Sequence, residues 1–182
     1  MNTEKHIWTI GHSTRTAEVF SGLLQSFGIE LLADIRTYPG SGRFPHFNRE
    51  NLELLLKEQD IGYLHMKELG GRRKPVKDSL NSAWRNPAFR GYADYMETEL
   101  FRKAIRELEE LAQIRHVAFM CSEATWWNCH RSLVSDYLKS RGWKVIHIMD
   151  KGKATEHPYT AAARIQDGKL NYSDDSLLFP GD

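Results

Sequence analysis

The chain has 182 residues, of which 41% are hydrophobic and 27% charged, and its formal net charge is +1 at pH 7. This length suits one domain, and the small net charge excludes a protein held to nucleic acid by bulk positive charge alone, although not a local basic patch. No apolar run approaches the roughly 20 residues that span a bilayer, and no secretory signal follows the polar segment 1–6. Two cysteines do not make a disulfide scaffold, so we expect a cytoplasmic protein with free thiols.

Short apolar runs alternate with segments of helical periodicity along most of the chain. The apolar runs predict strands over residues 7–10, 29–35, 63–66, 116–120 and 143–148. Apolar residues at helical spacing predict helices around residues 19–27, after a cap at Asn48, from Pro87 to about Ile114, and over residues 129–141. Three of these helices end beside a glycine that precedes a strand, at Gly28, Gly62 and Gly142.

Strands that alternate with helices are joined by right-handed crossovers into a parallel sheet. We therefore predict a single-domain, three-layer α/β fold over residues 1–182, with a mainly parallel sheet of about five strands and a core over residues 7–150. Asp167-Gly168 lies between two short strand-like runs and is a strong turn signal. It predicts a small C-terminal β-hairpin, an appendage over about residues 157–175 and not a second domain.

Reactive residue types gather where the predicted strands end. In an open parallel sheet, ligands bind outside the carboxyl ends of the strands. The residues that fall there are His12, Ser13, Asp34, Arg36, Cys121, Glu123, Cys129, His130 and Arg131. We therefore expect these residues to form one site at that edge of the sheet.

The segment 121–131 is the most informative part of this group. Asn128 is a plausible helix cap that would place Cys129, His130 and Arg131 in a first helical turn, where anions are favoured and the pKa of a cysteine falls. Packing of a buried thiol is the alternative for each cysteine. The spacing from Arg131 fits no phosphatase-type loop, since Cys129 is too near and Cys121 too far, and paired zinc-knuckle spacing is absent.

The other candidates each have two interpretations. Asp34 and Arg36 share one face of a strand, so they either pair as a buried salt bridge or Arg36 binds an acidic group that Asp34 orients. Ser13 either contacts a ligand or caps a helix, a role for which Thr14 and Thr16 compete. His12 follows a glycine that allows the backbone to approach a ligand closely.

A long connection over residues 69–90 carries many basic residues and the pair Gly70-Gly71. It is either a solvated charged loop, a basic lid over an anionic substrate, or a surface for single-stranded nucleic acid. Trp126-Trp127 would add stacking surface near this edge or belong to the core. The segment 157–160 could fold back over the site.

At these residues the chain resembles the family of domain of unknown function 488. The matching motifs are Thr9-Ile10-Gly11-His12-Ser13, Asp34-Ile35-Arg36, Leu69-Gly70-Gly71, Cys121-Ser122-Glu123 and Cys129-His130-Arg131. The tail from His157 to Tyr172 resembles one branch of this family, whereas many relatives have proline where this chain has Trp126 or Trp127. The resemblance implies that the motifs form one site; the family name carries no agreed activity.

Three functions from different classes follow from these residues. The leading hypothesis is an enzyme, a transferase or hydrolase, that acts on a small anionic or nucleotide-like substrate. Arg36 and Arg131 would hold the anion, Cys121 or Cys129 would act as a thiolate, and Glu123 or His130 would move protons. The first alternative is a metal or redox site of Cys121, Cys129, His130 and His12. The second is a non-catalytic module for single-stranded nucleic acid that uses the basic loop. The sequence specifies no cofactor, metal or oligomeric state.

Overall fold

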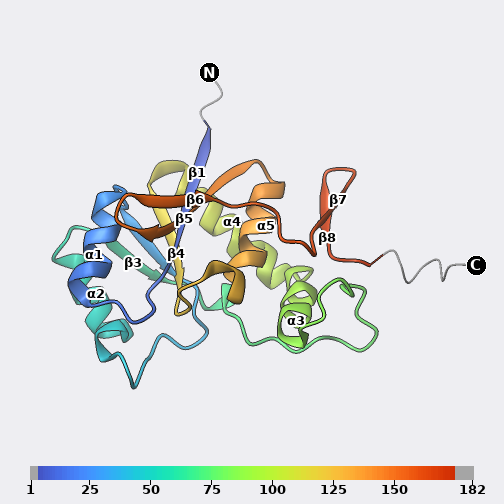
Figure 1. The fold of residues 1–182 in the computed structure, drawn as a ribbon, viewed down its shortest axis with the longest axis horizontal. Coiled ribbons are helices and arrows are strands. Elements are labelled where there is room, and N and C mark those ends of the chain that lie inside the picture. The colour runs from blue at the N-terminus through green and yellow to red at the C-terminus, as the bar shows by residue number, and fades with distance from the viewer. Residues whose placement is uncertain (1–3, 175–182) are drawn as a thin grey trace, which may run out of the picture.

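The central sheet lies between two layers of helices in the computed structural model, which describes residues 4–174 (Figure 1). Six strands form this sheet in the order β3-β2-β4-β1-β5-β6. The strands β1 to β5 run parallel, and β6 is antiparallel to β5 at the edge. Their bounds are Lys5–Gly11 for β1, Leu31–Asp34 for β2, Gly62–His65 for β3, Val117–Cys121 for β4, Trp143–Asp150 for β5 and Lys153–Glu156 for β6.

Helices connect the parallel strands and cover both faces of the sheet. Their bounds are Ala17–Ser26 for α1, Arg49–Lys57 for α2, Pro87–Met96 for α3, Glu99–Ile114 for α4 and Arg131–Ser140 for α5. Short 3-10 turns occur at Pro45–Phe47, Lys67–Leu69 and Trp126–Asn128. The predicted α/β fold with a mainly parallel sheet is thus confirmed.

The side chains of each strand alternate between two hydrophobic clusters, one on each face of the sheet. On β4, Ala118 and Met120 point to the face that α1 and α2 cover, where Phe20 and Leu52 are buried. Val117 and Phe119 point to the other face, which α3, α4 and α5 cover. This alternation is that of a strand buried on both faces.

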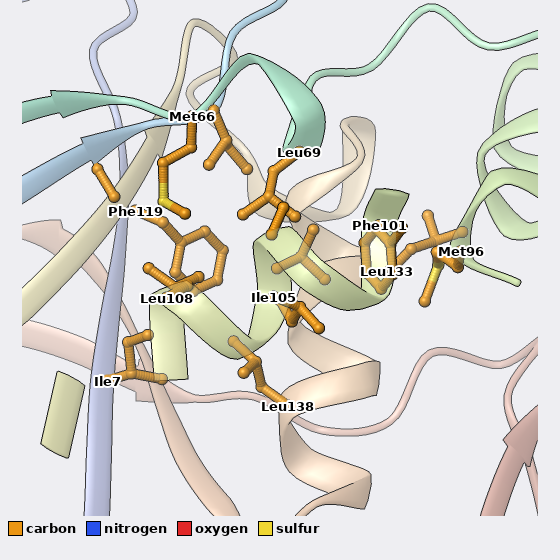
Figure 2. Packing of buried hydrophobic residues seen from close by; sticks show 14 of the residues in the cluster. Ile7, Met66, Leu69, Met96, Phe101, Ile105, Leu108, Phe119, Leu133 and Leu138 are labelled. Atoms are coloured by element: carbon orange, nitrogen blue, oxygen red, sulfur yellow. The ribbon is translucent and has the colours of Figure 1, made fainter. Parts of the chain in front are cut away.

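Leucine and phenylalanine side chains from α4 and α5 close the second face (Figure 2). Leu108 and Ile105 of α4 lie between Phe119 of the sheet and Leu138 of α5, and these four side chains are at most 1% exposed. Burial of side chains of this size contributes about 1.5–3 kcal/mol each. This cluster fixes α5, and with it the segment that precedes α5, against the sheet.

One part of the helical prediction was wrong, and another was confirmed in part. The helix expected over 87–114 is divided, because Thr98 adopts an extended conformation and its hydroxyl caps α4 by accepting a hydrogen bond from Phe101 N. Asn48 is the cap residue of α2 as predicted, since its carbonyl accepts from Leu52 N, but its side chain accepts from Ser41 N and not from the helix.

Strand β6 was not predicted, whereas the C-terminal hairpin was. All four residues of β6 are exposed and show no apolar alternation, so only pairing with the edge of β5 defines this strand. The hairpin joins β7, Arg164–Gln166, to β8, Lys169–Asn171. Its turn residues Asp167 and Gly168 both have positive φ, 50° and 72°, as a type I′ turn requires. Residue 175, at the end of the predicted appendage, lies outside the described residues.

The strand order creates a switch point between β1 and β4. These strands are neighbours, but the chain leaves β1 through α1 toward β2 and leaves β4 through α5 toward β5, on opposite faces and toward opposite edges. Ligands of open parallel sheets bind at such a point. The register pairs Gly11 with Cys121, so the segments after both strands begin side by side.

We predict that Leu108→Ala lowers the free energy of unfolding by about 2–5 kcal/mol, since it leaves a cavity in the cluster between α4, α5 and the sheet. Leu100→Ala on the same helix is the matched control, because Leu100 is 63% exposed and its change is expected to stay within about 0.5 kcal/mol. Denaturant unfolding measures both values. Equal effects would contradict this description of the core.

Candidate functional site

A cavity of about 290 Å³ opens at the carboxyl end of the sheet, beside the switch point. Its walls come from the segments after β2 and β4, from the loop before α3, from α3 itself and from the segment before α5. The lining residues are Arg36, Thr37, Tyr38, Gly40, Gly71, Arg72, Ala88, Phe89, Tyr92, Cys121, Ser122, Glu123, Asn128, Cys129 and His130. The predicted residues Arg36, Cys121, Glu123, Cys129 and His130 are among them.

Two cysteine sulfurs are in contact in the wall of this cavity. Cys121 is the last residue of β4, and Cys129 comes two residues before α5. Their Sγ atoms are 2.9 Å apart, both are free cysteines, and they are 2% and 6% exposed. At this distance one sulfur donates a hydrogen bond and the other accepts it.

The guanidinium of Arg131 lies against both sulfurs. Its Nε is 3.1 Å from Cys121 Sγ and 3.3 Å from Cys129 Sγ. The backbone N–H of Arg131 also donates to Cys129 Sγ, at 3.4 Å. A positive charge and one backbone N–H of the helix start therefore meet at the sulfur of Cys129.

The start of α5 differs from the prediction. Asn128 does not cap this helix; it ends a 3-10 turn, and its side chain donates to Thr125 Oγ1. Cys129 is extended, its carbonyl accepts from Ser132 N, and its sulfur accepts from Arg131 N. His130 is the residue at the N-terminal cap position of α5, and Cys129 precedes it, outside the first turn.

These contacts give the two thiols different acidities. Burial raises the pKa of Cys129, but the hydrogen bond from Cys121 and the charge and hydrogen bonds of Arg131 outweigh burial and lower the pKa to about 6. Burial, together with the hydrogen bond to Cys129, raises the pKa of Cys121 well above its ordinary value. Near neutral pH the pair therefore holds one proton, on Cys121.

Arg131 is enclosed by protein and is not in the wall of the cavity. Its side chain is 1% exposed, and Nη1 donates to Thr9 Oγ1 at 3.2 Å. Nη2 donates to the carbonyl of Glu123 at 2.6 Å. This arrangement makes Arg131 the counter-charge of the thiolate, whereas the sequence had suggested a direct contact with a ligand.

Gly11 is required for this arrangement. A Cβ atom at residue 11 would lie 1.7 Å from the carbonyl oxygen of Glu123 and 2.9 Å from Nη2 of Arg131. Any other residue would displace the segment after β4 together with the guanidinium. The glycine before His12 thus allows the backbone of Glu123, and not a ligand, to approach the end of β1 closely.

Asp34 and Arg36 form a buried bidentate salt bridge. Arg36 Nε is 2.9 Å from Asp34 Oδ1, and Nη2 is 2.6 Å from Oδ2, which also accepts from the Tyr63 hydroxyl at 2.7 Å. Nη1 of Arg36 lies 3.4 Å from His12 Nε2. These contacts use three of its five N–H groups. The salt-bridge interpretation is therefore realised, and Arg36 lines the cavity as well.

His12 and Ser13 face a second hollow, which shares Gly40, Ser122 and Glu123 with the first. His12 is stacked on Phe47, with ring centroids 4.2 Å apart, and burial lowers its pKa to about 4. Ser13 has a φ of 50° and does not cap α1; Thr16 does, by accepting from Val19 N.

The two residues proposed to move protons differ in their surroundings. Glu123 is exposed at the rim between both hollows. His130 lies 3.0 Å from the Ile35 carbonyl through Nε2, and burial lowers its pKa to about 4. A Cβ atom at residue 71 would lie 3.0 Å from the His130 ring, which explains one glycine of Gly70-Gly71.

The basic connection forms one wall of the cavity. The Arg72 guanidinium lies over the ring of Tyr38 at 5.6 Å, and both line the cavity. Arg73 lies over Tyr95 at 3.6 Å. Sequence reasoning did not select Tyr38, since an exposed tyrosine after a strand carries no pattern of its own.

The two tryptophans differ in their contacts, and the segment after β6 packs against the protein. Trp126 is stacked on His147, with centroids 4.5 Å apart and planes at 3°, whereas Trp127 is 50% exposed. His157 is buried at 1% exposure beside His147, so the segment after β6 does fold back onto the body of the protein. Neither His147 nor His157 was predicted as part of the site.

Within residues 4–174, no group of three or more His, Cys, Asp or Glu side chains is arranged to hold a metal ion. The described part of the chain also contains no helix that is long and apolar enough to cross a membrane.

Stability should depend on pH through these buried groups. The folded-state pKa values of His12, His130 and Cys129 are all lowered, so the unfolded chain binds more protons and stability rises with pH. The histidine contribution is complete above about pH 6.5, and that of Cys129 continues to about pH 8.5. We predict that Cys129→Ala abolishes the rise between these values in urea unfolding. Leu108→Ala, a control that is also destabilised, should keep it; equal slopes would contradict the assignment.

Comparison with known proteins places these residues in a wider group. The family model described as Domain of unknown function DUF488 matches residues 15–138, more than half of the chain. Searches of curated proteins and of solved structures gave no match. The matched region contains Asp34, Arg36 and both cysteines, and it ends within α5. The chain therefore belongs to the DUF488 family.

Proposed function

We propose that this protein is an enzyme that uses the Cys129 thiolate on a small anionic or nucleotide-like substrate bound in the 290 Å³ cavity. The observation that carries the proposal is the position of the Cys129 sulfur, in the cavity wall between a thiol donor and a buried guanidinium. Cysteines with a lowered pKa beside cationic groups and helix starts are typical nucleophiles. A reducing compartment such as the cytoplasm would keep both thiols reduced.

The lining of the cavity supports the choice of substrate class. Arg36 and Arg72 bring positive charge to it, and Arg36 keeps N–H groups beyond those that hold Asp34 and His12. Tyr38 and Phe89 add aromatic surface to the same walls. A cavity at the small end of the usual range accommodates a phosphate or a single nucleotide-like group.

The chemistry assigned to these residues is group transfer. The Cys129 thiolate attacks an electrophilic atom of the substrate, and the bond to the leaving group breaks as the bond to sulfur forms. The leaving group takes its proton from solvent in the open cavity, and the Glu123 carboxylate at the rim would take one from the water or acceptor that releases the product. His130 keeps the segment before α5 in place through its contact with Ile35.

The test is the rate at which iodoacetamide labels each cysteine in the native protein, measured against pH by mass spectrometry. We expect Cys129 to be labelled with a midpoint near pH 6, as its lowered pKa requires, and Cys121 to stay protected. Inorganic phosphate or adenosine monophosphate should slow the labelling of Cys129. Arg72→Ala should weaken that protection, whereas Arg106→Ala, on exposed α4 surface, should not.

A labelling midpoint near the free-thiol value of about 8.5 would remove the activated thiolate from the proposal. Protection of both cysteines until the protein unfolds would do the same. Labelling of Cys129 that neither anion slows would leave the thiolate in place but contradict the substrate class.

A second candidate function, dithiol redox chemistry, is favoured by the contact between the two sulfurs. A peroxide would oxidise the Cys129 thiolate to a sulfenic acid while one peroxide oxygen leaves as water. The Cys121 sulfur would then attack the sulfenic sulfur, form a disulfide and release a second water. The sequence left open whether these sulfurs belong to a metal site or to a redox site. No third His, Cys, Asp or Glu side chain among the described residues is arranged to bind a metal together with the two sulfurs, so the geometry favours the redox site.

Hydrogen peroxide treatment tests this alternative. If the pair is a redox centre, the intact mass should fall by two hydrogens at low peroxide, and a dithiol reductant should reverse the change. Cys121→Ser should instead accumulate oxygen adducts at Cys129, since no resolving thiol remains. Overoxidation of the wild type without a disulfide would contradict this function.

Binding of single-stranded nucleic acid stays a prediction. Trp126 is already stacked on His147, and Arg73 on Tyr95, so two of the groups that would hold bases or phosphates are engaged within the protein. We therefore rank this function below the other two.

A further inference from the structure

A line of buried polar side chains leads away from the thiol site toward the C-terminal segment. It starts at Arg131, whose Nη1 donates to Thr9 Oγ1, and Thr9 Oγ1 lies 2.7 Å from His147 Nδ1. His147 Nε2 is 2.9 Å from His157 Nδ1, and His157 Nε2 is 2.8 Å from Asp136 Oδ1. All five side chains are at most 1% exposed. Buried polar groups in such a line are costly unless each has its partner.

The two ends of the line determine the direction of its hydrogen bonds. A guanidinium only donates, so Thr9 accepts from Arg131 and must give its own hydrogen to His147 Nδ1. His147 then donates through Nε2 to His157, and His157 donates through Nε2 to the Asp136 carboxylate. Each of the three groups between Arg131 and Asp136 donates once along the line and accepts once. Both histidines are neutral in this arrangement.

The opposite direction leaves a group without a partner. A positively charged His157 would donate from both ring nitrogens, so His147 would have to donate toward Thr9. Two donors would then meet at Thr9 Oγ1, and its own hydrogen would have no acceptor along the line. Burial, together with the positive charge of Arg131, lowers the pKa of His147 to about 2, which agrees with a neutral ring.

Neighbouring side chains surround this line, and Asp136 has partners outside it. Asp136 also accepts from the Thr160 hydroxyl and from the Tyr172 hydroxyl through Oδ2. Trp126, from the segment between the two cysteines, covers the face of the His147 ring. The line therefore joins the thiol site to the segment after β6, beyond the part of the chain that the family model matches.

We propose that Thr9, His147 and His157 are positioning residues of the thiol site. The two histidines, anchored at Asp136, keep the Thr9 hydroxyl oriented as an acceptor for Arg131. This hydroxyl in turn holds the Arg131 guanidinium against both sulfurs. The inference deepens the proposed thiolate chemistry and rests on it. A hydroxyl that rotates freely can turn its hydrogen toward a cation. The Nδ1 of a neutral His147 carries no hydrogen in this arrangement, so it accepts the hydrogen of Thr9 and prevents this rotation.

The line positions a charge and does not conduct a proton. The group at its sulfur end is a guanidinium, which stays protonated in proteins, so no proton can leave the thiol site by this route. What the line can change is how strongly Arg131 favours the thiolate of Cys129. The pH profile of Cys129 is therefore the property to measure.

The experiment compares iodoacetamide labelling of Cys129 against pH in full-length variants. Thr9→Val removes the hydroxyl at nearly constant shape, and His157→Leu breaks the line at its middle. We expect both to raise the midpoint by about one pH unit, which is about a tenfold loss of thiolate at pH values below the midpoint. Thr9→Ser and His157→Gln can still accept and donate in the same direction, so they should keep the wild-type midpoint.

Tyr172→Phe controls for a structural role. It removes a hydrogen bond to the other oxygen of Asp136 and should lower the unfolding temperature without moving the Cys129 midpoint. If His157→Leu does not fold, the isosteric pair Thr9→Val and Thr9→Ser decides the question. The readout for this pair is the pH midpoint of Cys129 labelling, which a change in stability alone does not move.

The outcomes separate this inference from the function on which it rests. A wild-type midpoint near about 8.5 would contradict the activated thiolate, and both proposals with it. A low wild-type midpoint that Thr9→Val leaves unchanged would overturn only the positioning role. An equal shift in Thr9→Val, Thr9→Ser and Tyr172→Phe would show that general loosening is the cause, and would overturn that role too.

Discussion

The buried guanidinium of Arg131 is the interaction on which the rest of the site depends. A buried charge is costly unless a partner of opposite charge and enough acceptors surround it. Arg131 obtains its acceptors from the Glu123 carbonyl, Thr9 and the two sulfurs, and only the sulfurs offer it a negative charge. The thiolate and the buried arginine therefore stabilise each other. Loss of either leaves the other buried without its counter-charge.

The sheet supplies the precision that this arrangement needs. The β1–β4 register places Gly11 beside Cys121, and the glycine lets the Glu123 carbonyl approach the strand end. The cluster between α4, α5 and the sheet then fixes where α5 begins, and Cys129 precedes that start. Two sulfurs eight residues apart in sequence thus come within 2.9 Å through strand register and helix packing, without any local motif for the contact.

The fold was predictable because it follows from local patterns, and the edge of the sheet that carries the candidate site follows from the same patterns. Apolar runs and glycine stops mark the strands and helices, and parallel strands bring their carboxyl ends to one edge. The roles of single residues were less accessible. Asn128 has the chemistry of a cap, but its side chain bonds to Thr125 and α5 begins later, with His130 at the cap position. Thr9 and His147 look like ordinary strand residues, and the hydrogen bond between them spans 138 positions of sequence.

Arg131 also bears on the choice between nucleophilic and redox chemistry. A disulfide between Cys121 and Cys129 would carry no charge, so its formation would leave the guanidinium without its negative partner. That cost falls on the oxidised form, while the thiolate of the reduced form is stabilised. A pair of this kind is more readily reduced than an ordinary structural disulfide. The same charge that lowers the pKa of Cys129 thus favours the dithiol state, which is the state that the proposed nucleophilic chemistry requires.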